Sequence, residues 1–276
     1  MSCPQDELPA SINKLNEDLR RIVQWSNDNG LKLNPSKSKC LRIASKPILS
    51  SLNSSSFPNV LLDGMIIPFS HTVKDLGLTW NEHLTWTEHV SSVSKKAFAT
   101  LHSLSRLKNF LPTSLKKMLV QALVMPHVDY CNVVLANLDD VHTYRLQRIQ
   151  NASVRFIFNL KHYDHLTSFF NRLQWLKASQ RQEWHSLALL FKILRARQPS
   201  YLFQRFKFLS DHHNRDTRSR ANLLLSIPHH NSSFYSKSYT VSVSRKWNEL
   251  PTSIRDFNSL TSFKSMLYNH LLEQNN

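Results

Sequence analysis

The first apolar pattern along the chain has the spacing of a helix. Five apolar side chains within residues 11–29 fall on one face at 100° per residue, and they are Ile12, Leu15, Leu19, Ile22 and Val23. An apolar face of this kind predicts an amphipathic helix. Ser11 is positioned to cap its start and Gly30 to end it, because serine accepts backbone hydrogen bonds and glycine adopts left-handed backbone angles.

The next stretch changes from a helical to an alternating pattern. Residues 34–37, with an Asn-Pro pair, predict a turn, and the alternation over residues 40–44 predicts a strand. Residues 48–59 are rich in serine and show no period, so they predict a loop.

Two short apolar runs then flank an Asp-Gly pair. The runs cover residues 60–63 and 65–68, with Asp63 and Gly64 between them. Asp-Gly between apolar runs is a strong hairpin signal, because a tight hairpin turn needs positive φ at its centre. Another strand is predicted over residues 76–80.

Helical periods dominate from residue 84 onward. Helices are predicted over residues 86–107, 113–124, 139–160, 178–196 and 260–272. A strand is predicted over residues 238–243, and the polar residues 211–232, with Arg215, Arg218 and Arg220, predict a loop or mobile arm. The predicted fold class is therefore α+β, with a helix and short antiparallel strands in residues 1–83, a helical domain in residues 84–210 and a third segment in residues 211–276.

Composition excludes several chemistries. The 276 residues include only three glycines, far apart from one another. Dinucleotide fingerprints, phosphate-binding loops and nucleophile elbows all need closely spaced glycines. No small-molecule substrate is predicted.

The charge of the chain favours a polyanionic partner. Lysine and arginine total 35 against 19 acids, which gives a formal net charge of +16. Most of the excess lies after residue 150, where 18 basic residues face 7 acidic ones. Nucleic acid is the leading candidate, and phospholipid would also attract such a surface. No apolar run is long enough to span a membrane and the start is acidic, so the predicted location is intracellular, nuclear or cytoplasmic.

Metal and acid-pair chemistry find little support in the sequence. Cys3, Cys40 and Cys131 are odd in number and widely spaced, so free thiols are predicted and no metal site. The adjacent pair Asp139 and Asp140 precedes a helical pattern, where acids complement the helix N-terminus.

Three arginines share one face of the helix predicted over residues 139–160. Arg145, Arg148 and Arg155 fall within an arc of about 80°. This arrangement has two interpretations, namely a ridge that contacts a phosphate backbone or an ordinary solvated surface.

Several strings resemble the reverse transcriptases of jockey-like non-LTR (LINE-type) retrotransposons. Residues 15–44 resemble motif D of the polymerase palm, with Trp25, the Asn-Gly-Leu-Lys-Leu-Asn run ending at Asn34, and Lys37 at the position of the motif's lysine. Residues 73–81 resemble motif E, the primer grip, with Lys74, Leu76 and Gly77 as matching positions. Three further segments of this chain resemble the thumb and C-terminal segments of these elements, namely residues 122–132, 146–157 and 247–267.

The resemblance implies the C-terminal edge of a palm in residues 1–83, a thumb-like region in residues 84–210, and a basic arm with a C-terminal strand and helix beyond. It also implies a nucleic-acid template and primer as partners, together with the upstream part of the element. The Mg²⁺ ions of the complete enzyme are held by aspartates of an [FY]-x-D-D turn, which this chain lacks. The chain is therefore expected to hold no cofactor and to be inactive alone, with Lys37 as its one candidate catalytic residue. A non-catalytic nucleic-acid-binding module and a non-functional transposon remnant are the alternatives.

Overall fold

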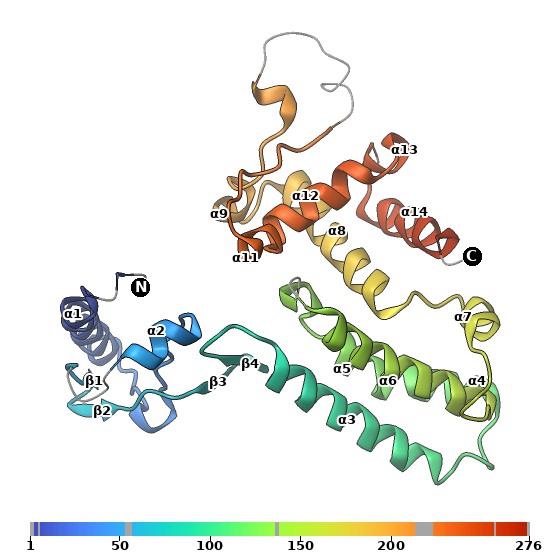
Figure 1. Ribbon diagram of the computed structural model, residues 1–276, viewed down its shortest axis with the longest axis horizontal. Coiled ribbons are helices and arrows are strands. Elements are labelled where there is room, and N and C mark those ends of the chain that lie inside the picture. The colour runs from blue at the N-terminus through green and yellow to red at the C-terminus, as the bar shows by residue number, and fades with distance from the viewer. Residues whose placement is uncertain are drawn as a thin grey trace. The chain divides into compact units, whose positions relative to one another are not determined.

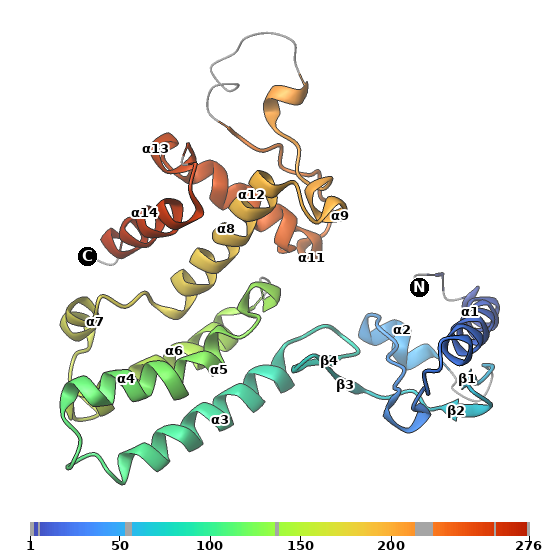
Figure 2. The same cartoon turned by 180° about the vertical axis from the view of Figure 1, so that it is seen from behind.

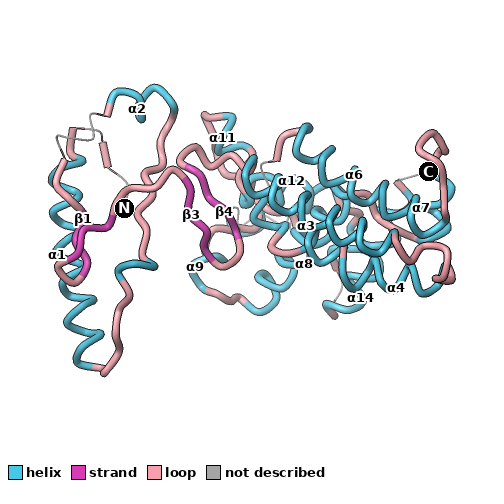
Figure 3. The backbone as a smooth tube through the Cα atoms, turned by 90° about the horizontal axis from the view of Figure 1, so that it is seen from below, coloured by secondary structure: helices cyan, strands magenta, loops and turns pink. Residues whose placement is uncertain are grey.

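The computed structural model describes residues 3–4, 6–52, 57–135, 138–212, 223–256 and 258–274. The chain mixes helices with two small antiparallel sheets, which confirms the predicted α+β class (Figure 1). It divides into two compact units, Met1–His89 and Val90–Asn276. The described strands all lie in the first unit, as Figure 3 shows in magenta.

The first unit begins with a long amphipathic helix. α1 spans Leu8–Asp28 and buries Ile12, while Gly30 follows it with φ of +66°. The predicted helix and its glycine end are confirmed. The predicted cap at Ser11 is wrong, because Pro9 lies in the first turn and the helix begins there, with Glu7 as its N-terminal flank.

The predicted hairpin is confirmed and packs on α1. β1 (Val60–Leu62) pairs antiparallel with β2 (Met65–Ile67), and both turn residues, Asp63 and Gly64, have positive φ. Val60, Leu62 and Ile67 form a small core with Ile12.

The side-chain amide of Asn16 also joins α1 to the hairpin. It accepts a hydrogen bond from the Leu61 N–H at 2.9 Å and donates one to the Asn59 carbonyl at 2.8 Å.

Two predictions in this unit are wrong. Residues 40–44 form no strand, and the only strand-like contact there is a parallel bridge between Cys40 and Phe69. Part of the predicted serine-rich loop is a helix, α2 (Lys46–Ser51), because Pro47 suits a first helical turn. Residues 53–56 of that predicted loop lie outside the described residues.

The strand predicted at residues 76–80 is part of a second hairpin. β3 (Thr72–Asp75) pairs with β4 (Leu78–Asn81). Leu76 and Gly77 form the turn between them, both with positive φ. The strand therefore begins two residues later than predicted.

The second unit is helical within its described residues. The single-turn 3-10 helix η1 (Pro35–Lys37) belongs to the first unit. α3 (Thr87–Ser105) begins in the last residues of the first unit and continues into the second. The other elements of the second unit are α4 (Thr113–Leu123), α5 (Met125–Asp129), η3 (Asn132–Leu135), α6 (Asp140–Phe158), α7 (Thr167–Leu173), α8 (Ala178–Ala196), α9 (Ser200–Phe203), η4 (Leu209–His212), α11 (Ser233–Ser236), α12 (Tyr239–Glu249), α13 (Thr252–Arg255) and α14 (Leu260–Glu273). The five predicted helices of this region are confirmed, with ends that differ by at most two residues.

α8 is the central helix of this unit. It contacts α5, α6, α9, α12 and α14, and the view from behind in Figure 2 shows α12 and α14 beside it. The rings of Phe191 on α8 and Phe263 on α14 stack at 4.3 Å, and Trp247 on α12 packs against Phe263. α12 and α14, from the predicted third segment, thus share a core with a helix of the second.

The strand predicted over residues 238–243 is wrong, since this segment belongs to α12. Its apolar and polar residues alternate locally, but the buried residues of the whole helix recur at helical spacings of three and four, and they are Val241, Val243, Ser244 and Trp247. Packing against α8 follows that longer spacing, so tertiary contacts override local strand preference.

The polar segment at residues 211–232 is only partly described. Arg215, Arg218 and Arg220 lie outside the described residues. Shortly after the described residues resume at residue 223, Leu225 is buried and exchanges two hydrogen bonds of 2.8 Å with the side chain of Asn248, which fixes this part of the loop to α12.

Candidate nucleic-acid interface

The start of α6 is fixed by an acidic cap. The Asp139 carboxylate accepts a hydrogen bond from the backbone N–H of His142 at 2.7 Å, and Asp140 occupies the first turn. That backbone hydrogen bond holds the pKa of the Asp139 carboxyl below its ordinary value. The prediction that this acid pair complements a helix N-terminus is confirmed.

The buried face of α6 determines which face meets solvent. α6 contacts α4 and α8, and it buries Leu146, Ile149, Gln150, Ser153, Val154, Phe156 and Ile157. Arg145 and Arg148 lie on the opposite side and are exposed. The sequence prediction that these arginines share an outward face agrees with this burial pattern.

Arg155 has a different role from the other two arginines. Its guanidinium donates hydrogen bonds to the carbonyls of Lys161, at 3.3 Å, and His162, at 2.9 Å. α6 ends at Asn159, which has φ of +55°, so the chain turns back and brings those carbonyls within reach. Arg155 therefore holds the loop that follows α6 against the helix.

Two tyrosines missed by the sequence analysis lie beside these arginines. Tyr144 is 63% exposed and falls within an arc of about 100° that includes Arg145, Arg148 and Arg155. Tyr163, in the loop held by Arg155, is 73% exposed. We call Tyr144, Arg145, Arg148, Arg155, Lys161 and Tyr163 the α6 ridge.

Further cations surround the loop end of the α6 ridge. Lys161 Nζ lies 5.7 Å from the centroid of the Tyr163 ring, and the exposed Arg172 on α7 lies over Phe158 at 5.3 Å. The acidic Asp164 accepts the Lys161 N–H at 2.7 Å and is half-buried. The exposed charge at this end is therefore mainly positive, next to aromatic rings.

The helical period offered a signal for only one of the two tyrosines. Tyr144 directly precedes Arg145, so a search for aromatic side chains on the arginine arc would have found it. Tyr163 lies in a loop, where no period applies, and its position depends on the turn at Asn159.

The structure places the other predicted site residues in the first unit. Lys37 is exposed at the end of η1, where its backbone N–H donates to the Asn34 side chain at 3.2 Å. Lys74, Leu76 and Gly77 share the β3–β4 hairpin, with Leu76 83% exposed at its tip. Lys37 belongs to a separate element from these three residues.

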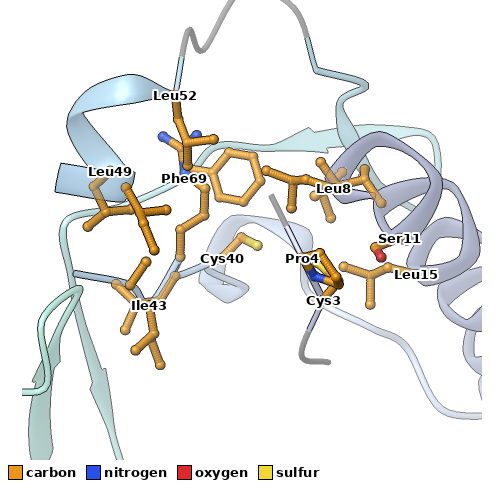
Figure 4. A pocket seen from close by; sticks show the side chains of 16 residues that line it. Cys3, Pro4, Leu8, Ser11, Leu15, Cys40, Ile43, Leu49, Leu52 and Phe69 are labelled. Carbon is orange, nitrogen blue, oxygen red and sulfur yellow. The ribbon is translucent and has the colours of Figure 1, made fainter. Parts of the chain in front are cut away.

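The first unit also contains an apolar cavity of about 710 Å³ (Figure 4). Leu8, Ile43, Leu49 and Phe69 are among its apolar lining residues, and the guanidinium carbon of Arg42 lies 4.5 Å from the Phe69 ring centroid. Burial raises the pKa of the Cys40 thiol at its wall, and the charge of Arg42 opposes this effect only in part. The thiol is thus protonated near neutral pH, which does not suit a nucleophile.

The described residues include no group of three or more histidine, cysteine or acidic side chains that could hold a metal ion. The Mg²⁺ implied by the family resemblance therefore finds no fitting set of ligands among them. No helix in the described part of the chain is long and apolar enough to cross a membrane. Comparison with known proteins found no matching family model, no matching curated protein and no matching solved structure.

Proposed function

We propose that this chain binds nucleic acid through the α6 ridge without reading base edges. The observation that carries the proposal is the pair of exposed arginines, Arg145 and Arg148, on a helix whose opposite face is buried. A guanidinium donates two parallel hydrogen bonds to phosphate oxygens, so adjacent arginines on a rigid helix fit a phosphate backbone. The net charge of +16 supports the same class of partner.

We propose further that these contacts belong to RNA-directed DNA synthesis by a jockey-like non-LTR retrotransposon. The support is the sequence resemblance of residues 15–44 and 73–81 to palm motifs and of residues 247–267 to the C-terminal segment. The chain would supply template and primer contacts and no catalysis, since its sequence contains no [FY]-x-D-D turn.

The salt dependence of binding tests the first proposal. Each duplex phosphate that the protein neutralises contributes about −0.9 to the slope of log K against log salt concentration. The variant Arg145→Gln/Arg148→Gln should flatten the slope measured on duplex DNA by up to about 1.8. Arg155 stays unchanged in this variant, because it also holds the loop.

The matched control removes exposed charges from the first unit. Lys14 and Lys46 are exposed there, so Lys14→Gln/Lys46→Gln lowers the net charge by the same amount. The control should leave the slope within about 0.5 of the wild-type value. Equal flattening by both variants would show that only overall charge matters and would overturn the assignment of the α6 ridge.

A further inference from the structure

The α6 ridge combines cations with two exposed aromatic rings, and the rings indicate which nucleic acid it takes. We infer that the α6 ridge binds single-stranded nucleic acid in preference to duplex, with Tyr144 and Tyr163 stacking on unpaired bases. This inference rests on the proposed nucleic-acid binding and names its substrate class. Bases in a duplex are stacked on one another, so only a single strand offers free faces to a tyrosine ring.

Tyr144 is placed to act together with the first two arginines. It lies one residue before Arg145 and one helical turn before Arg148, so the three side chains leave the helix in neighbouring directions. The ring is attached to a helix whose other side is packed, and its exposure leaves room for a base. A strand whose phosphates contact the arginines would therefore pass its bases beside this ring.

Tyr163 is held in place although it lies in a loop. The two hydrogen bonds from Arg155 fix the carbonyls of the two preceding residues, and Asp164 binds the Lys161 N–H. Lys161 places its ammonium over the ring, where a cation is attracted to the aromatic face. A ring carried by a fixed backbone loses less conformational freedom on binding than one on an unrestrained loop, which favours its use as a stacking surface.

The two tyrosines lie beside opposite ends of the arginine row. Tyr144 is on the first turns of α6, and Tyr163 adjoins Arg155 near the end of the helix. The rise from residue 144 to residue 155 is about 16 Å. This length suits a short run of nucleotides, with phosphates between the two stacked bases.

The test compares one strand with the duplex formed from it. Fluorescence anisotropy would measure binding of the full chain to a labelled oligo(dT) of about 20 nucleotides and to the matching oligo(dT)–oligo(dA) duplex at constant salt. Tyr144→Ala and Tyr163→Ala should each weaken single-strand binding by roughly 5- to 100-fold and change duplex binding by less than about 2-fold. Tyr144→Phe and Tyr163→Phe should bind like the wild type, because they keep the ring.

Two further variants separate this inference from the proposal on which it rests. Tyr201→Ala removes a tyrosine that is 66% exposed outside the α6 ridge, on α9, and should leave both affinities unchanged. Arg145→Gln/Arg148→Gln should weaken the binding of both nucleic acids. Suppose that the arginine variant weakens the binding of single strand and duplex alike. If the Tyr→Ala variants then change neither affinity, or change the two affinities equally, the single-strand inference is wrong and the proposed function stands. If the wild type binds neither nucleic acid, both are wrong.

Discussion

The ammonium of Lys116 on α4 donates a hydrogen bond of 2.8 Å to the side-chain oxygen of Asn159, the residue at which α6 ends. Lys116 is only 2% exposed, and its ammonium also lies 5.7 Å from the Phe156 ring centroid. A buried lysine thus links the end of the candidate nucleic-acid helix to its neighbour. Burial lowers the pKa of Lys116, and the charge of Lys108 lowers it further.

This burial predicts how stability depends on pH. Between the lowered folded-state pKa of Lys116 and its ordinary value of 10.5, the unfolded chain binds more protons than the folded chain. The free energy of unfolding should therefore rise with pH across that window. Lys116→Met should lack this rise in the free energy of unfolding with pH. At pH 7 its free energy of unfolding should stay within about 1 kcal/mol of the wild type, because the substitution removes both the cost of desolvating the charge and the hydrogen bond.

Urea unfolding of both proteins between pH 7 and pH 10 measures this difference. Lys116→Ala is the contrasting variant, because it leaves a cavity and should cost about 2–4 kcal/mol. A Lys116→Met protein that loses as much stability as the alanine variant, or that keeps the wild-type pH profile, would contradict the prediction.

The cap of α6 predicts an acid-sensitive contribution. Asp139→Ala should cost about 1 kcal/mol, because it removes the acceptor for the His142 N–H. The pKa of Asp139 is lowered on folding, so its contribution is present above the unfolded value and is lost as the pH falls through the folded pKa. Thermal unfolding at pH 7 and at pH 2 checks this: the difference in Tm between the wild type and Asp139→Ala should be smaller at pH 2 than at pH 7.

Asp140→Ala is the control for the cap, because Asp140 lies in the same first turn without capping the helix. It should cost less than about 0.5 kcal/mol. Equal losses for the two alanine variants would mean that charge at the helix start, and not the cap, stabilises α6.

An ion pair joins α5 to α8. Arg181 donates two hydrogen bonds to the Asp129 carboxylate, the first at 2.9 Å from Nε, and both side chains are largely buried. Asp129→Ala leaves the largely buried Arg181 without this carboxylate, and Arg181→Ala leaves Asp129 with the more distant His185 Nε2 at 4.0 Å, so each variant should cost about 2–4 kcal/mol. A double-mutant cycle in urea should give a coupling energy of about 1–3 kcal/mol, and additive losses would show that the pair contributes only packing.

Two of the three thiols, Cys40 and Cys131, should differ in reactivity. Cys131 is exposed, whereas Cys40 is partly buried and its pKa is raised by that burial. Thiolates react and thiols do not, so alkylation by iodoacetamide at pH 8 should label Cys131 well before Cys40, as followed by mass spectrometry. In about 6 M urea the two rates should converge, and a difference that persists there would not come from the fold.

Primer extension provides the functional control for the proposed polymerase assignment. The chain alone should extend no primer on an RNA or DNA template with Mg²⁺ or Mn²⁺, because its sequence contains no [FY]-x-D-D turn for the metal ions. Denaturing gels with a labelled primer would detect any product. Template-dependent extension by the highly purified chain would overturn our view that it supplies contacts only.

Long periodic segments were predictable from sequence, and short ones were not. The helix over residues 178–196 was predicted to the residue, because its apolar side chains recur over five turns and pack against several neighbours. α2 has six residues, too few to show a period, and residues 40–44 alternate as a strand does yet find only a single bridge partner. An alternating pattern shows that a segment could form a strand, but it does not show whether another strand lies beside it to pair with.

In the candidate site, too, sequence periodicity predicted some features and missed others. Arg145 and Arg148 followed from helical geometry alone, because the apolar residues along α6 determine which face of the helix is buried and which is exposed. The role of Arg155 depends on carbonyls six and seven residues further on, which reach it only through the left-handed turn at Asn159. No spacing rule indicates that contact.

The contact of Asn16 with the first hairpin has a consequence for the chain in solution. A sheet of two strands has two outer edges, and exposed backbone groups on an edge can recruit a strand from another molecule. Through its bonds to Leu61 and Asn59, the Asn16 amide takes the place that a third strand would have beside β1. α1 thus shields the first strand of the hairpin against self-association.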